Sequence, residues 1–243
     1  MKKAMIALVA SLMMNGVNVQ ANEAVEKKKN LIVTQEVTVQ QVVDKYIKAA
    51  GGIDKVKAIK NMEMNMETEI QGMTLVIKAV TDQEHNRLLN LTKMNGNQVA
   101  KTVIKDNKGK VVSMGQEQDL TEDQLNSMKS QTFVFPELFY EELGYEVSYG
   151  GTEDVEGEAA YKLLLKDASG VETSEFYSVE SGLKLKTESE AAGTVSYKDY
   201  MEVDGIMVPS KMVIANAMMP APMEAKITSV VFNQALDSGL FEF

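Results

Sequence analysis

The stretch "NMEMNMETEI", residues 61–70, decides the fold because the spacing of apolar residues changes there from a helical period to strict alternation. Met62, Met64 and Met66 occupy every second position, with polar residues between them. Successive side chains of a β-strand point to opposite faces of a sheet, so the stretch predicts a strand with one methionine face and one wet face. Methionine suits both irregular core packing and promiscuous apolar binding. The methionine face is therefore either a core filler or the lining of an apolar groove.

The same alternation recurs along the chain between turn signals. Leu75 and Ile77 lie in the next apolar stripe, and Asn95-Gly96 is a strong type I′ hairpin signal because both residues tolerate positive φ. Further strands are expected over residues 145–149, 161–166, 173–179, 183–188, 194–203, 206–214 and 225–232. The short turns leave no room for crossover helices, so we expect the strands to pair antiparallel.

Two of the later strands indicate which side of the sheet is wet. Leu163 and Leu165 alternate with lysines, and Leu183 and Leu185 flank Lys184 in the same way. An antiparallel sheet commonly has one face on the core and one face in water. The pattern predicts that these leucines face the core and that Lys184 faces solvent.

Helical signals precede the first strand and recur in the middle of the chain. Thr38 opens a capping-box pattern for a helix that ends at Gly51-Gly52, and a short helix is expected over residues 53–59. A second capping box predicts a helix over residues 121–129. Pro136 then fits the first turn of a further helix, in "PELFYEEL".

These elements predict an α+β fold for residues 38–243. We expect one strongly curved antiparallel sheet, a half barrel of about 10 or 11 strands, with helices covering its concave face. An up-and-down barrel is the alternative architecture.

The N-terminus has the form of an export signal. Lys2 and Lys3 precede a short apolar run, and small residues precede Asn22, which predicts a signal peptide over residues 1–21. The apolar run is shorter than the roughly 20 residues that a membrane-spanning helix needs. Residues 22–37 carry a solvated charge run and are expected to form a flexible tether. We therefore expect a periplasmic protein that is not integral to the membrane.

Charge and composition exclude several classes of partner. Loss of the signal peptide removes two of the 25 basic residues and none of the 35 acidic residues, which leaves a net charge near −12. Such a surface repels nucleic acid and anionic membrane faces. The chain has no cysteine, so it has no disulfide, no thiol nucleophile and no lipid anchor on cysteine.

Catalytic patterns are missing from the sequence. His85 is the single histidine and lies beside Asp82 and Glu84, so we interpret it as a solvated turn residue. A zinc-protease helix needs two histidines, and the Gly-x-Ser-x-Gly elbow of serine hydrolases does not occur. The acidic pairs lack ligand spacing, and no glycine loop opens a helix to bind phosphate. We expect no catalytic residue, no metal and no cofactor.

The chain resembles the outer-membrane lipoprotein carrier and sorting family of the LolA/LolB type, and in particular its Bacteroidetes-type members. The helix followed by two glycines, "VVDKYIKAAGG", fits that family. The other matching stretches are "EGEAAYKLLL" (156–165), "EFYSVESGLKLK" (175–186), "YKDYMEVDGIMVPSKM" (197–212) and "FNQALDSGLFEF" (232–243).

The resemblance implies a half-open barrel whose helices enclose an apolar cavity for the acyl chains of lipoproteins. The expected lining residues are Met62, Met64, Met66, Leu75, Ile77, Leu163 and Leu165. The aromatic segment "FVFPELFYEEL" is a candidate lid over that cavity or, alternatively, a fixed core helix. Its candidate lid residues are Phe133, Phe135, Leu138 and Phe139.

Two functions follow from this interpretation. The first is an exported, soluble, non-enzymatic carrier that holds lipid or lipoprotein acyl chains, or another apolar ligand, and serves lipoprotein sorting to the outer membrane. The second is a non-catalytic accessory module with a packed interior, which binds a protein of an envelope protease or assembly system.

Overall fold

The computed structural model describes residues 37–70, 72–190, 192–217 and 221–243. The signal peptide predicted over residues 1–21 lies outside the described residues, and so does the tether predicted over residues 22–37 except for Val37. Both therefore stay predictions.

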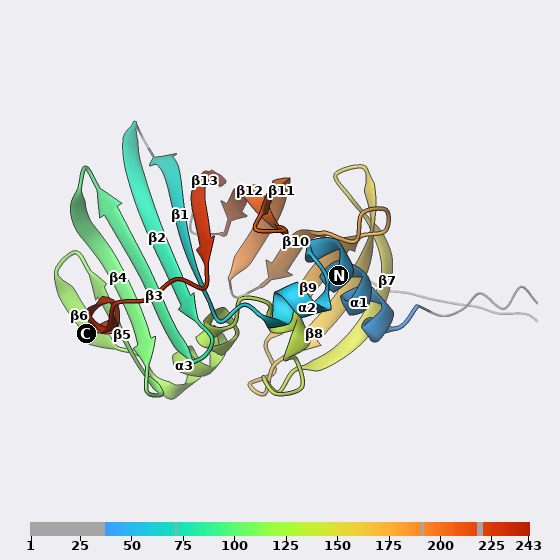
Figure 1. Ribbon diagram of the computed structural model, residues 1–243, viewed down its shortest axis with the longest axis horizontal. Coiled ribbons are helices and arrows are strands. Elements are labelled where there is room, and N and C mark those ends of the chain that lie inside the picture. Colours follow the sequence, from blue (N-terminus) through green and yellow to red (C-terminus); the bar gives the residue numbers. More distant parts are fainter. Residues whose placement is uncertain (1–36, 71, 191, 218–220) are drawn as a thin grey trace, which may run out of the picture. The chain divides into compact units, whose positions relative to one another are not determined.

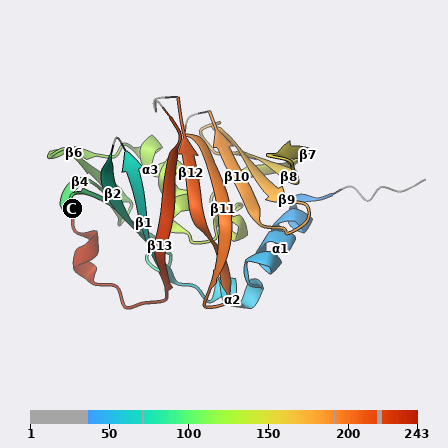
Figure 2. The ribbon, with the colours of Figure 1, turned by 90° about the horizontal axis from the view of Figure 1, so that it is seen from above.

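A strongly curved antiparallel sheet forms most of the described chain (Figure 1), and Figure 2 shows it turned by 90°. Its 13 strands follow the order β6-β5-β4-β3-β2-β1-β13-β12-β11-β10-β9-β8-β7. The predicted α+β class and curved sheet are confirmed, with more strands than the ten or eleven expected. The strands are β1 (Asn61–Ile70), β2 (Met73–Asp82), β3 (Arg87–Met94), β4 (Asn97–Lys105), β5 (Lys108–Ser113), β6 (Gln116–Asp119), β7 (Glu146–Val155), β8 (Glu158–Lys166), β9 (Glu172–Ser178), β10 (Lys184–Ser189), β11 (Gly193–Val203), β12 (Ile206–Ala215) and β13 (Met223–Phe232).

The methionine strand β1 lies in the middle of the sheet, between β2 and β13. Met64 sits opposite Ala79 of β2 and Val230 of β13. Glu63, on the other face, forms an ion pair with Lys78 at 2.8 Å. The strand predicted over residues 61–70 is confirmed, with its methionines on the concave face and its acidic residues on the outer face.

Helices α1 (Val39–Ala50) and α2 (Ile53–Lys57) lie on the concave side of the strands β7–β13 (Figure 1). The capping box is present, because the Gln41 amide donates to the Thr38 hydroxyl at 3.2 Å and the Thr38 amide donates to the Gln41 side chain at 3.0 Å. Gly51 ends α1 with a φ of 140°. A Cβ atom there would lie 2.5 Å from the Gly205 carbonyl oxygen, so the helix can approach β12 this closely only with glycine.

A long connection, residues 120–145, joins the edge strand β6 to the opposite edge strand β7. We name it the crossing segment. It contains α3 (Glu122–Met128), which confirms the helix predicted over residues 121–129, and the two 3₁₀ turns η1 (Lys129–Thr132) and η2 (Pro136–Leu138).

The helix predicted to start at Pro136 is wrong. Only three residues form a 3₁₀ turn there, and Phe139 leaves helical geometry with a φ of −128°. Glu137 and Tyr140 are buried, and so is Phe135 before the turn.

The last residues of the chain pack on the outer face of the sheet. The turn η3 (Ser238–Phe241) places Phe241 in a small cluster with Val80, Leu89 and Val103, which point away from the concave face. The Arg87 guanidinium lies 4.3 Å from the centre of the Phe241 ring. The outer face of the strands β2–β4 is therefore covered by this segment, an arrangement that the sequence patterns did not predict.

We expect Phe241→Ala to lower the free energy of unfolding by about 3 kcal/mol, because it removes a buried ring and leaves a cavity. Phe241 is 1% exposed, whereas Phe243, two residues on, is 47% exposed. Phe243→Ala is therefore the matched control and should change stability by less than about 0.5 kcal/mol. Urea unfolding of the full chain measures both values, and a loss below about 0.5 kcal/mol for Phe241→Ala would show that this ring does not hold the outer face.

Candidate ligand-binding pocket

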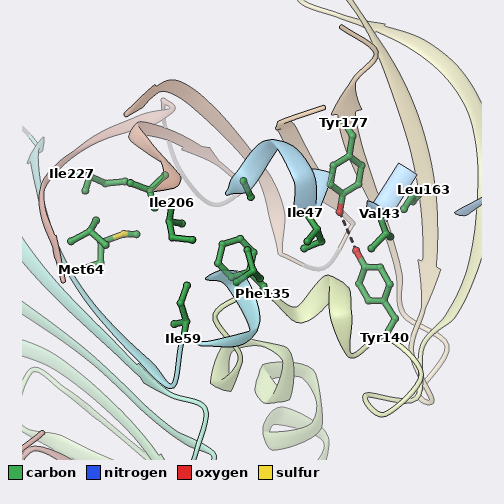
Figure 3. Packing of buried hydrophobic residues seen from close by; sticks show 14 of the residues in the cluster. Val43, Ile47, Ile59, Met64, Phe135, Tyr140, Leu163, Tyr177, Ile206 and Ile227 are labelled. Carbon is green, nitrogen blue, oxygen red and sulfur yellow. Dashed lines mark hydrogen bonds between the residues drawn. The ribbon is translucent and has the colours of Figure 1, made fainter. Parts of the chain in front are cut away.

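An apolar cluster fills the space between α1 and the strands β7–β13 (Figure 3). Val43 and Ile47 of α1 pack beside Leu163 and Tyr177 of the sheet, and Phe135 reaches the same cluster from the crossing segment. These side chains are buried, so this part of the half barrel is a packed core.

A pocket of about 200 Å³ lies next to this cluster, beside the central strands. Four groups of elements contribute to its wall: α1, the central strand β1, the crossing segment and the strands β10–β13. Its apolar part is lined by Met62, Met64, Phe135, Val208, Met212 and Phe232. Its polar part is lined by Tyr46, Glu137, Lys184, Tyr197 and Tyr200. The pocket therefore has an apolar wall and a polar end.

A buried ion cluster forms the polar end. The Lys184 ammonium binds Glu175 Oε1 at 2.8 Å and also contacts Glu137 Oε1. The Tyr177 hydroxyl donates to Glu175 Oε2 at 2.5 Å, and the Tyr140 hydroxyl donates to the same oxygen. The two tyrosine oxygens lie 3.1 Å apart, as the dashed line in Figure 3 marks.

Burial controls the protonation of this cluster. It raises the pKa of Glu137, with a further contribution from the Glu175 charge, and Lys184 only partly opposes this rise. Burial also acts against the charged form of Glu175, but the Lys184 ammonium and the two tyrosine hydroxyls lower the pKa of that carboxyl. Although burial disfavours a charged lysine, the two carboxylates raise the pKa of Lys184 well above its usual value. Glu175 and Lys184 are thus held as an ion pair.

The prediction that Lys184 faces solvent is wrong. Its side chain points into the half barrel, while Leu183 and Leu185 stay half-buried. The pairing of β9 with β10 shifts register between Lys184 and Lys186, so Lys186 faces outward again and lies over the Phe176 ring at 4.2 Å. A local register shift breaks strict alternation, and the sequence carries no signal for it.

The predicted lining residues occupy three different places. Met62 and Met64 line the pocket. Met66 is buried in the apolar cluster, as are Leu163 and Leu165 on the face that packs against α1. The remaining two, Leu75 and Ile77, are half-buried on the concave wall of β2, beyond the pocket.

The predicted lid residues also separate. Phe135 lines the pocket, and its ring lies 6.2 Å from the Tyr46 ring. Phe133 and Phe139 pack against each other, with ring centres 4.7 Å apart. Leu138 packs at the edge of the apolar cluster. The sequence did not suggest the polar pocket residues Glu137, Lys184, Tyr197 and Tyr200, because polar side chains carry no periodic signal for burial. It also did not suggest the apolar lining residues Val208, Met212 and Phe232.

Other chemistry is limited in the described part of the chain. No group of three or more histidine or acidic side chains is arranged there to hold a metal ion. No described helix has both the length and the apolar character needed to cross a membrane. His85 lies 3.0 Å from Asp82 and is largely exposed. The arrangement at the pocket can bind an apolar or amphipathic molecule and hold one buried charge beside it.

Comparison with known proteins shows the fold. No family model matches the sequence, and no curated protein matches it. A LolA superfamily protein from Nitrosomonas europaea has a similar structure, with a TM-score of 0.56 and 13% identity, over 85% of this chain and 98% of that one. A DUF1329 family protein from Desulfovibrio piger has a TM-score of 0.55 and 13% identity, over 84% and 97%. A domain from Vibrio parahaemolyticus, described as an outer membrane lipoprotein-sorting protein, has a TM-score of 0.50 and 14% identity, over 82% and 97%.

We expect Lys184→Met to lower the free energy of unfolding by about 3–5 kcal/mol, because it leaves the buried Glu175 carboxylate without its counter-charge. Lys198→Met is the control, since Lys198 forms an exposed ion pair with Glu156 at 2.7 Å. Removing an exposed pair should cost less than about 1 kcal/mol. Urea unfolding at neutral pH measures both variants, and a stable Lys184→Met protein would contradict the buried ion cluster.

The raised pKa of Glu137 predicts that stability falls as the pH rises above 4.5, the usual pKa of a glutamate. Above that value the unfolded chain has released this proton while the folded chain still holds it, so deprotonation favours unfolding. Glu137→Gln should remove this decline. Glu175 acts in a separate window below pH 4.5, because its pKa is lowered and its stabilisation is lost as the pH falls.

Urea unfolding at several pH values between about pH 5 and pH 8 tests this expectation. Glu141→Gln serves as the control because Glu141 is exposed on the same crossing segment. A decline of the same size in wild type and Glu137→Gln would show that Glu137 does not cause it.

Proposed function

We propose that this protein is an exported, soluble, non-enzymatic carrier of the LolA/LolB type. It holds lipid or lipoprotein acyl chains, or another apolar ligand, inside the half barrel, and it works in the periplasm in lipoprotein sorting. The pocket of about 200 Å³ next to Met62 and Met64 carries this proposal, because apolar side chains between the sheet and the crossing segment line a space that a ligand can enter.

The concave wall beyond the pocket supports the same function. Ile77 of β2 sits opposite Met66 of β1, and Leu75 sits opposite Thr68. Helices α1 and α2 lie over the other half of the sheet (Figure 1), and Leu75 and Ile77 keep part of their surface in solvent. A chain that starts in the pocket can therefore continue along the inner faces of β1 and β2.

The binding energy available is sufficient for a carrier. Each methylene group removed from water contributes about 0.8 kcal/mol, so six buried methylenes contribute roughly 5 kcal/mol. This pocket is smaller than the usual 300–1,000 Å³ of ligand sites. It therefore suits one chain, with the rest of the ligand on the open wall.

The shared fold with a LolA superfamily protein and with a described lipoprotein-sorting domain supports the choice of ligand. The predicted signal peptide and the net charge near −12 support export and solubility. The competing function, an accessory module that binds an envelope protein, requires a packed interior with no room for a ligand.

The neutral apolar probe 1-N-phenylnaphthylamine tests the carrier proposal. We expect the full chain to bind it with a rise in fluorescence, and Met212→Trp to weaken binding at least about fivefold because the larger ring fills the pocket. Val231→Trp adds the same ring on the outer face of β13, where Val231 is exposed, and should leave binding unchanged.

Circular dichroism of each variant checks that the fold is kept. A wild-type protein that does not bind the probe, or a folded Met212→Trp protein that binds it as tightly as wild type, would contradict the proposal. A protein that excludes the probe and captures an envelope protein instead would support the accessory module.

A further inference from the structure

The buried ion cluster at the pocket has an uneven charge. The side chains of Glu137, Glu175 and Lys184 are 3%, 9% and 8% exposed. Two carboxylates share one ammonium, so the fully ionised cluster keeps one negative charge away from water. A buried charge without a partner is costly, and it is stabilised only by a further positive or hydrogen-bond-donating group.

The uncompensated charge belongs to Glu137. Both oxygens of Glu175 accept hydrogen bonds, from Lys184 on one side and from Tyr140 and Tyr177 on the other. Glu137 contacts Lys184 through Oε1 alone. Its Oε2 atom is buried, and no donor among the described residues reaches it.

This unsatisfied oxygen belongs to a residue in the wall of the pocket. Glu137 lines the pocket together with Met62, Met64 and Phe135. The residue that carries the acceptor without a donor therefore also borders an apolar surface suited to an aliphatic chain. A buried polar group of this kind in a ligand pocket is the feature that fixes the orientation of a ligand.

We propose that the pocket selects single-chain amphiphiles whose head group carries an ammonium, with the ammonium bound by the Glu137 carboxylate and the chain on Met62 and Met64. This inference rests on the proposed carrier function and names its ligand class. An ammonium supplies the missing donor and favours the ionised form of Glu137, whose charge it balances. A carboxylate head would place a third negative charge beside Glu137 and is disfavoured. A hydroxyl head supplies a donor without the charge and ranks between the two.

The volume of the site supports one chain. A pocket of about 200 Å³ is too small for the two chains of a diacyl lipid at the head-group end. The ammonium can belong to a free aliphatic amine or to the ethanolamine of a lysolipid. Both present an ammonium to Glu137, but the lysolipid carries a phosphate between its ammonium and its chain, which adds a negative charge near the two carboxylates.

Displacement of 1-N-phenylnaphthylamine by amphiphiles of equal chain length tests the head group. Dodecylamine, dodecanol and dodecanoate are added below their micelle concentrations at neutral pH. We expect dodecylamine to compete at least about tenfold more tightly than dodecanol, and dodecanoate to compete most weakly. Lauroyl lysophosphatidylethanolamine forms a fourth arm: competition equal to dodecylamine identifies the lysolipid head as a source, and weaker competition identifies the free amine.

Glu137→Gln locates the contact. We expect it to weaken dodecylamine binding about tenfold and to change dodecanol binding less than about twofold. Glu141→Gln, on the same segment and exposed, should behave as wild type. The comparison of head groups on the wild-type chain needs no variant, so it decides the matter even if Glu137→Gln does not fold.

The results separate the two proposals. A wild-type protein that binds the neutral probe but prefers dodecanoate, or shows no preference among the three heads, overturns the ammonium site and leaves the carrier function standing. An unchanged amine preference in folded Glu137→Gln overturns the role of Glu137. A protein that binds neither the probe nor any amphiphile overturns the carrier function and the ammonium site together.

Discussion

The antiparallel pairing of β1 with β13 is the interaction on which the rest of the structure depends. It joins the first and last strands in the middle of the sheet, so the chain must leave the sheet at the edge strand β6 and enter it again at the opposite edge strand β7. The crossing segment is the only part of the described chain that makes this passage. It brings Phe135 and Glu137 to the concave side, where they close one wall of the pocket.

Two kinds of packing meet at that wall. Helix α1 fills the half of the barrel formed by β7–β13 with ordinary apolar side chains, whereas the inner faces of β1 and β2 keep part of their apolar surface open. Between them lies the ion cluster of Glu137, Glu175 and Lys184, held by tyrosine hydroxyls. Buried charges of this kind add little net stability but impose one arrangement on their surroundings, and here they set the polar end of the pocket.

Features that depend on neighbouring residues along the chain were predicted from the sequence, and features that depend on distant residues were not. The strand at Met62–Met66, the capping box at Thr38 and the turn at Asn95-Gly96 depend on neighbours along the chain, and their patterns predicted them. Strand β6 was missed because its four residues are all exposed and polar. The inward direction of Lys184 was missed because it depends on a register shift against β9. Of the residues that line the pocket, the sequence suggested Met62, Met64 and Phe135. The polar end was missed because it is built from residues that are distant in sequence.

The central pairing also has a consequence for how the chain acquires its structure. β13, the partner of β1, follows all the other strands in the sequence, and the segment around Phe241 that covers the outer face of β2–β4 comes after it. Contacts between such distant parts of a chain form slowly and late. Neither the middle of the sheet nor its outer cover can be completed until β13 and this segment have been synthesised. Until then β1 lacks one of its two neighbours in the sheet.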